Sequence, residues 1–141
     1  MSDARAPDLL LYSYWRSSSA YHVRIALNLK GIEYRQQAIH LVRKGGEQNS
    51  AAYRTVNPLG LVPALVHEGR TVVQSLAICE YLEECFPTPA LLPADAPGRA
   101  RVRGLVQTIC SEIQPLNNLS VLNFLKTGLG QDDAAVTAWY S

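Results

Sequence analysis

The chain has 141 residues, of which 48% are apolar and 18% charged, and its formal net charge is +1. This composition excludes a disordered chain, and the length suffices for one full domain but not comfortably for two. The near-neutral charge offers no general attraction for nucleic acid or an anionic membrane, so any bound anion needs a local site.

The sequence contains no signal for membrane insertion or export. No apolar run approaches the roughly 18 residues that cross a bilayer. The acidic, proline-containing start at 1–8 is not followed by the apolar core and cleavage site of a signal peptide. We therefore expect a cytoplasmic protein. Without a CxxC pair or a histidine at metal-ligand spacing, its cysteines are expected to be reduced and packed, with no metal: Cys79, Cys85 and Cys110.

The first part of the sequence predicts the element order β-α-β-α-β-β-α. An apolar run at Leu9–Tyr14 predicts a buried strand, and the serines after it predict the start of a helix that ends at Gly31. The further elements are expected at 32–39, 49–56, 63–66, 71–73 and 75–86. A helix between the first two strands implies parallel pairing, and the later hairpin adds antiparallel pairs. The fold class is therefore α/β, a thioredoxin-like domain with a mixed four-stranded sheet.

In the helix expected at 75–86, Ser75 is the predicted cap and Glu83 is expected on the outer face. Four of the eight prolines then fall between 87 and 97, which predicts a stiff, extended linker. Apolar residues at helical spacing follow, and Pro115 is expected to kink that helix. The expected domains are a thioredoxin-like domain at 1–86, a proline-rich linker at 87–97, and the start of an all-helical domain at 98–141.

Three junctions of the predicted fold offer groups that bind a small peptide. The helix start at Ser17–Ser19 presents N–H groups and hydroxyls to an anion, although simple capping explains the serines equally well. Pro63 either begins a strand with an ordinary trans bond, or has a cis bond that turns the backbone of Val62 toward a peptide ligand. Gln74 and Ser75 either bind the amine and carboxylate of an amino acid or only cap the next helix. Together these junctions suit a small peptide with a thiol and two carboxylates.

Several segments resemble zeta-class glutathione transferases, and the resemblance covers nearly the whole chain from Leu9 onward. Tyr12–Gly31, with its serine triplet followed by Val-Arg-Ile-Ala-Leu, resembles the N-terminal signature of that class. The other similar segments are Asn57–Leu65, Gln74–Ile78, Glu80–Glu83, Leu91–Pro93 and Ile113–Leu122. The family signature has cysteine where this chain has Ser19. Family members also continue through further helices, so we expect this chain to be a fragment or its substrate pocket to be incomplete.

The resemblance implies glutathione as the cofactor and Ser17 as the catalytic serine, which stabilises the thiolate at a helix N-terminus. Glutathione contacts are implied for Ser17, Ser18, Ser19, Ala20, Tyr21, His22, Gln48, Val62, Gln74 and Ser75, and from the second domain for Gln114, Asn118, Leu119 and Ser120. The implied reaction is cis–trans isomerisation of maleylacetoacetate to fumarylacetoacetate in phenylalanine and tyrosine breakdown. A homodimer and a small dicarboxylate substrate are also implied, without nucleic acid or membrane partners.

Other assignments stay open at this point. Tyr12 and Tyr14 are rivals of Ser17 as the thiolate partner, although packing accounts for both. Arg16 is the candidate for binding the substrate carboxylates, whereas Arg24 is expected to form a structural ion pair. His40 and His67 are expected to be solvated. The alternative functions are maleylpyruvate isomerisation, general glutathione transfer to electrophiles, and a non-catalytic binding module with the same fold.

Overall fold

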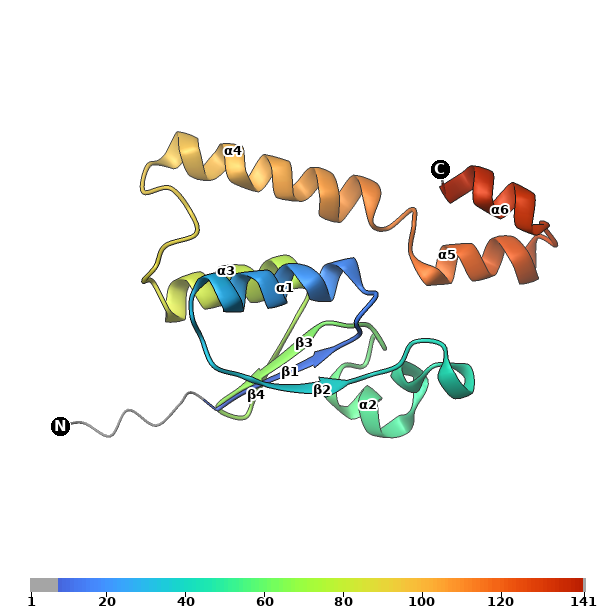
Figure 1. Cartoon of the computed structure of the whole chain (residues 1–141), viewed down its shortest axis with the longest axis horizontal. Coiled ribbons are helices and arrows are strands. Elements are labelled where there is room, and N and C mark those ends of the chain that lie inside the picture. Colours follow the sequence, from blue (N-terminus) through green and yellow to red (C-terminus); the bar gives the residue numbers. More distant parts are fainter. Residues whose placement is uncertain (1–7, 141) are drawn as a thin grey trace. The chain divides into compact units, whose positions relative to one another are not determined.

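The computed structural model describes residues 8–140 and divides the chain into two compact units (Figure 1). The first unit extends to Ala94 and the second begins at Asp95, a boundary that lies inside the predicted proline-rich segment. None of the helices in residues 8–140 has the length and apolar character needed to span a membrane.

The first unit is built on a four-stranded mixed sheet with the order β2-β1-β3-β4. Its strands are β1 (Leu9–Ser13), β2 (Arg35–Ala38), β3 (Ala64–His67) and β4 (Arg70–Val73). β1 pairs in parallel with β2 and antiparallel with β3, which in turn pairs antiparallel with β4. The thioredoxin-like fold class predicted from the element order is confirmed.

Helices cover both faces of this sheet (Figure 1). On one face lie α1 (Ser18–Leu29) and α3 (Ser75–Cys85), and on the other lies the short α2 (Ala51–Val56). The core beneath α1 and α3 consists of Leu9, Leu11, Val23, Ala26, Leu27, Leu65, Ile78 and Leu82. A second cluster contains Tyr14, Ile39, Tyr53 and Val62. Because alternate residues of a strand face opposite sides, Leu9 and Leu11 enter the first cluster while Tyr12 packs against the second.

The second strand begins at Arg35 and not at Ile32 as the sequence predicted. The N–H of Ile32 donates to the carbonyl of Leu27 at 3.0 Å, and the N–H of Gly31 donates to Asn28 at 3.1 Å. These two bonds form a Schellman motif, in which Gly31 adopts a positive φ of 64°. Ile32 therefore closes the helix that precedes it and is not available to the sheet.

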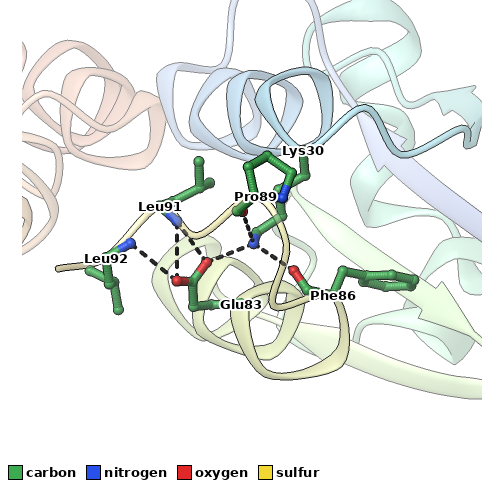
Figure 2. Close-up of polar contacts among 6 residues, drawn as sticks. All are labelled: Lys30, Glu83, Phe86, Pro89, Leu91 and Leu92. Carbon is green, nitrogen blue, oxygen red and sulfur yellow. Dashed lines mark hydrogen bonds and ion pairs between the residues drawn. The ribbon is translucent and has the colours of Figure 1, made fainter. Parts of the chain in front are cut away.

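Glu83, expected on the outer face of its helix, instead forms an ion pair with Lys30 (Figure 2). The ammonium of Lys30 also donates to the carbonyls of Phe86 at 2.7 Å and Pro89 at 2.9 Å. The carboxylate of Glu83 accepts hydrogen bonds from the backbone N–H groups of Leu91 and Leu92. The pair thus joins the ends of α1 and α3 to the segment 86–92.

His67 is buried, contrary to the expectation that it is solvated. Its Nδ1 lies 2.8 Å from the hydroxyl of Tyr81, and its ring packs against Phe86. Within residues 8–140 none of the three cysteines forms a disulfide, but Cys85 is exposed, so the expected packing is wrong for this residue.

The second unit contains α4 (Ala96–Gln107), α5 (Leu119–Asn123) and α6 (Asp133–Tyr140). Asp95 caps α4 by accepting from the N–H of Gly98 at 2.7 Å, with Pro97 in the first turn. α4 continues into a π-helical stretch, Thr108–Ile113, and the chain then turns before α5. The structure therefore breaks the helix near Pro115, where the sequence predicted only a kink.

Candidate functional site

The sheet brings the three predicted junctions to one of its ends. Tyr12 of β1 pairs with Ala64 of β3, which pairs with Val73 of β4. The end of β1, the start of β3 and the end of β4 are therefore adjacent. Ser13 also pairs with Ala38, so the loop that follows β2 leaves the sheet at the same end. The segments that carry Ser17, Val62, Gln74 and Gln48 consequently all meet the sheet at the same end of its strands.

Ser17 is the N-cap of α1, a helix of 12 residues. Its Oγ accepts from the N–H of Ala20 at 3.1 Å, and its own N–H donates to the carbonyl of Tyr14 at 3.0 Å. Because the cap uses an oxygen lone pair, the hydroxyl hydrogen is available for a second partner. The side chain thus places a hydrogen-bond donor at the positive end of a helix dipole, a favourable position for an anion.

The five residues after Ser17 differ in what they present to a ligand. Ser18 and Tyr21 are exposed, Ser19 and His22 are half-buried, and Ala20 is fully buried. Ala20 therefore offers its backbone only. Burial lowers the pKa of His22, which favours the neutral imidazole at neutral pH. His22 accordingly provides a hydrogen-bonding group but no positive charge for an anionic ligand.

Val62 precedes a cis peptide bond to Pro63. Its side chain is buried, and within residues 8–140 its backbone N–H and C=O have no hydrogen-bond partner. The preceding carbonyl, that of Leu61, accepts from the hydroxyl of Tyr53 and from Nδ2 of Asn57, both at 2.7 Å. These two hydrogen bonds fix the loop before Pro63 through the carbonyl of Leu61. They leave the backbone of Val62 available for an extended ligand.

Gln74 has a positive φ of 71°, which is unusual for a residue other than glycine. It occupies the N-cap position of α3, and its side chain makes no capping bond. The sequence placed the cap at Ser75, which instead is the first residue of the helix and is buried. Strained backbone of this kind occurs at ligand-binding positions, and the exposed Gln74 amide is consistent with that role.

Gln48 contains an unsatisfied buried atom. Its Nε2 donates to the carbonyl of Leu41 at 3.3 Å, but its Oε1 is buried and has no partner within the described residues. Gly46 packs directly against this amide, and a Cβ there would lie 2.6 Å from Oε1. A buried acceptor of this kind normally has a hydrogen-bond donor, which residues 8–140 do not supply.

The rival tyrosines have structural partners. The ring of Tyr14 lies 5.0 Å from that of His40, and Tyr12 lies 5.6 Å from Tyr53. His40 is not merely solvated, because its Nδ1 accepts from two backbone N–H groups of the loop. Arg16 is exposed and lies over the ring of Trp15 at 5.6 Å.

The four candidates of the second unit lie around the start of α5. Asn118 caps this helix through Oδ1, which accepts from the N–H of Ser120 at 3.0 Å and from its hydroxyl at 2.9 Å. Leu119 is the first residue of α5, and Gln114 follows the π-helical stretch. The ten candidates of the first unit therefore lie on segments that meet one end of the sheet, whereas Asn118, Leu119 and Ser120 lie at the start of α5 and Gln114 precedes it.

Sequence reasoning missed the residues that hold the Val62 loop. Asn57 is 2% exposed, and its Oδ1 accepts from the N–H of Leu59 in an Asx turn at 3.1 Å. Asparagine before proline is a recognisable signal for such a turn, so Asn57 could have been found. Tyr53 carried no comparable signal because its hydroxyl partner is eight residues away.

Comparison with known proteins identifies the first unit. The family described as glutathione S-transferase, N-terminal domain, matches residues 16–85. Maleylacetoacetate isomerase of Pseudomonas aeruginosa is 51% identical over 130 residues, which make up 92% of this chain and 61% of that protein.

Solved structures similar to this chain come from the same family. A holo structure of maleylpyruvate isomerase, a bacterial zeta-class glutathione S-transferase, has a TM-score of 0.88 at 47% identity, covering 93% of this chain and 61% of the other. A maleylacetoacetate isomerase from Methylobacterium extorquens AM1, with bound malonate and glutathione, has a TM-score of 0.88 at 39% identity and the same coverage. The chain therefore spans about three fifths of the length of the relatives that it matches.

Proposed function

This chain belongs to the glutathione S-transferase family through its N-terminal domain, and we propose that it serves the glutathione-dependent cis–trans isomerisation of maleylacetoacetate to fumarylacetoacetate. The observation that carries the proposal is the hydroxyl of Ser17 at the N-terminus of α1, on the segment that leaves the sheet where β1 ends, β3 starts and β4 ends. As a second candidate, maleylpyruvate isomerisation is supported by the 47% identity to a solved maleylpyruvate isomerase.

The groups at this end of the sheet fit glutathione. The unsatisfied Oε1 of Gln48 suits an N–H donor, and the backbone of Val62 suits pairing with a peptide. The start of α3 at Gln74 and Ser75 suits a carboxylate, because helix N-termini favour anions. Glutathione contacts from Gln114, Asn118, Leu119 and Ser120 are also proposed, on the resemblance to the zeta class.

Glutathione, when bound, would supply a thiolate that adds to the conjugated double bond and leaves again after rotation about the resulting single bond, so that it is not consumed. Ser17 stabilises that thiolate through a charge-assisted hydrogen bond of about 1.5–3 kcal/mol. The N-terminus of α1 adds about 0.3–1 kcal/mol. Because 1.36 kcal/mol corresponds to one pKa unit, the two terms lower a thiol pKa of about 8.5 by about 1–3 units. No side chain is then needed as a base near neutral pH.

The proposed substrate is a small dicarboxylate, bound through Arg16. The exposed guanidinium lies one residue before Ser17, and the Methylobacterium relative binds the dicarboxylate malonate together with glutathione. A cytoplasmic location and a homodimer are proposed on the resemblance to the zeta class. No nucleic acid or membrane partner is proposed.

The test is the loss of the cis double bond in maleylacetone, followed with and without glutathione in the wild-type chain and in Ser17→Ala. Glutathione-dependent isomerisation that Ser17→Ala loses supports the proposal. Equal rates in the two proteins contradict the role of Ser17. Parallel assays on maleylpyruvate and a chlorinated aromatic distinguish the two isomerases and a general transferase.

A non-catalytic module is distinguished by binding. A chain that binds glutathione at a hundredfold excess over its dissociation constant gains about 2.7 kcal/mol of stability, which is visible as a thermal shift. Absence of any shift at millimolar glutathione would contradict a glutathione site, whereas a shift without isomerisation indicates binding alone.

A further inference from the structure

Arg24 reaches back from the second turn of α1 to the loop that precedes Ser17. Its Nη1 donates to Oγ of Ser13 at 2.7 Å and to the carbonyl of Tyr14 at 3.2 Å. Its Nη2 donates to the carbonyl of Trp15 at 3.3 Å. One guanidinium therefore donates to three consecutive residues, from the last residue of β1 into the loop before α1.

The partners of Arg24 differ from those that the sequence predicted. An ion pair with a carboxylate was expected, but the bonds go to a hydroxyl and two backbone carbonyls. The guanidinium also lies over the ring of Tyr21 at 5.2 Å. A planar, forked cation stacked on an aromatic ring is held in orientation, which a flexible ammonium cannot reproduce.

The carbonyl of Tyr14 connects Arg24 directly to the proposed catalytic residue. It accepts from the N–H of Ser17 at 3.0 Å and from Nη1 of Arg24 at 3.2 Å. The other anchor, Ser13, is fully buried, and its carbonyl accepts from Ile39 at 2.9 Å. The loop is thus hydrogen-bonded at Ser13 to Ile39, which follows β2, and to α1 through Arg24.

We infer that Arg24 is a positioning residue for Ser17, holding the loop at Tyr14 and Trp15 so that the Ser17 hydroxyl is oriented toward a thiolate at the start of α1. This inference rests on the proposed function. It assigns to Arg24 a role in the reaction without contact to glutathione or substrate. The orientation of Ser17 depends on the geometry of the Arg24 guanidinium and not on its charge alone, because its three hydrogen bonds fix three neighbouring residues.

Arg24→Lys and Arg24→Met separate geometry from charge. Lysine keeps the positive charge but loses the fork, and methionine loses both. The matched controls are Arg35→Lys and Arg35→Met, because the side chain of Arg35 is 71% exposed and, within residues 8–140, its guanidinium pairs with Asp8 at 2.8 Å. Circular dichroism establishes that each variant is folded, and if Arg24→Met does not fold, Arg24→Lys decides the question.

The readout is the pH titration of the ultraviolet absorbance of the glutathione thiolate bound to the chain. We expect both Arg24 variants to raise the apparent thiol pKa by about one unit, a tenfold lower thiolate-to-thiol ratio at a given pH, with the Arg35 variants within twofold of wild type. We also expect faster hydrogen exchange of the Ser17 amide in the Arg24 variants.

An unchanged thiol pKa in Arg24→Lys, together with a raised one in Ser17→Ala, would overturn the inference and leave the proposed function intact. A rise in Arg24→Met but not in Arg24→Lys would also overturn it, because charge alone would then account for the effect. A wild-type chain that does not lower the thiol pKa would overturn both the inference and the proposed function.

Discussion

The ammonium nitrogen of Lys30 and Oε2 of Glu83 lie 2.6 Å apart, and the Lys30 side chain is fully inaccessible to solvent. Two backbone carbonyls and two backbone N–H groups complete the network around this pair (Figure 2). All of these backbone groups belong to the segment 86–92. The pair therefore determines the path of the chain as it leaves α3.

Glu83→Gln should destabilise the first unit by about 3–5 kcal/mol, because it leaves the Lys30 charge buried without a counterion. The free energy of unfolding in urea measures the loss. Glu84→Gln is the matched control: it changes the adjacent, exposed carboxylate and should stay within about 0.5 kcal/mol of wild type. Equal effects of the two substitutions would contradict the importance of the pair.

The Lys30–Glu83 pair should also make the free energy of unfolding depend on pH in the acidic range. Burial by itself raises the pKa of Glu83, but hydrogen bonds from Lys30, Leu91 and Leu92 outweigh it and hold that pKa below its ordinary value. The stabilisation is therefore complete above the ordinary glutamate pKa and is lost as the pH falls through the lowered folded value. The difference in unfolding free energy between wild type and Glu83→Gln should shrink over this range. A difference independent of pH would contradict the assignment.

Ser17→Ala should still bind glutathione but ionise its thiol less at neutral pH. Removal of the charge-assisted hydrogen bond should raise the thiol pKa by about 1–2 units, since the bond contributes about 1.5–3 kcal/mol. Loss of the N-cap should also cost about 1 kcal/mol of stability. Ser17→Thr, which keeps a hydroxyl and a cap, is the control and should restore part of the thiol ionisation. A thiol pKa in Ser17→Ala equal to that of wild type would assign the thiolate contact to another residue.

Gln48→Ala should separate binding from stability. Because Oε1 of Gln48 is already unsatisfied in the free chain, its removal relieves a desolvation cost, so stability should stay within about 1 kcal/mol of wild type. The dissociation constant for glutathione should rise by about tenfold, the effect of one hydrogen bond of about 1.4 kcal/mol. Calorimetric titration checks the affinity, with Gln36→Ala on the exposed β2 as control. Unchanged affinity would exclude Gln48 from the site.

Tyr53→Phe should reduce alkaline sensitivity. Burial, with a smaller contribution from Tyr12, raises the pKa of Tyr53 to about 12, although the bond with Asn57 acts in the opposite direction. Between pH 10.0 and about 12 the unfolded chain loses a proton that the folded chain retains, so stability falls as pH rises. The variant should lose about 0.5–1.5 kcal/mol at neutral pH and flatten this fall. A parallel decline in both proteins would contradict the assignment.

The elements of the sheet, its parallel first pair and its antiparallel hairpin were predictable because the sequence carries strong local signals. The apolar run at Leu9–Tyr14 marks a buried strand, Gly31 ends a helix, and the hairpin turns at Glu68 and Gly69. The gathering of Ser17, Val62 and Gln74 followed from topology alone, because adjacent strand ends meet at one edge.

Long-range partners were not predictable. Lys30 fits the apolar stripe of its helix, but only the folded chain brings Glu83 to it across 53 positions of sequence. Arg24 was expected to form an ion pair, but its acceptors are the hydroxyl of Ser13 and two backbone carbonyls. Every residue has a backbone carbonyl, so no sequence pattern distinguishes these partners. Likewise, His67 was expected in solvent because its partner Tyr81 lies on another element. The roles of the individual site residues remain predictions.

The most direct test of the account is the pH titration of glutathione bound to this chain, because the central claim is that the first unit ionises a thiol at Ser17. We predict saturable binding and an apparent thiol pKa about 1–3 units below the ordinary value of about 8.5. No binding at millimolar glutathione, or a bound thiol with its ordinary pKa, would contradict the claim.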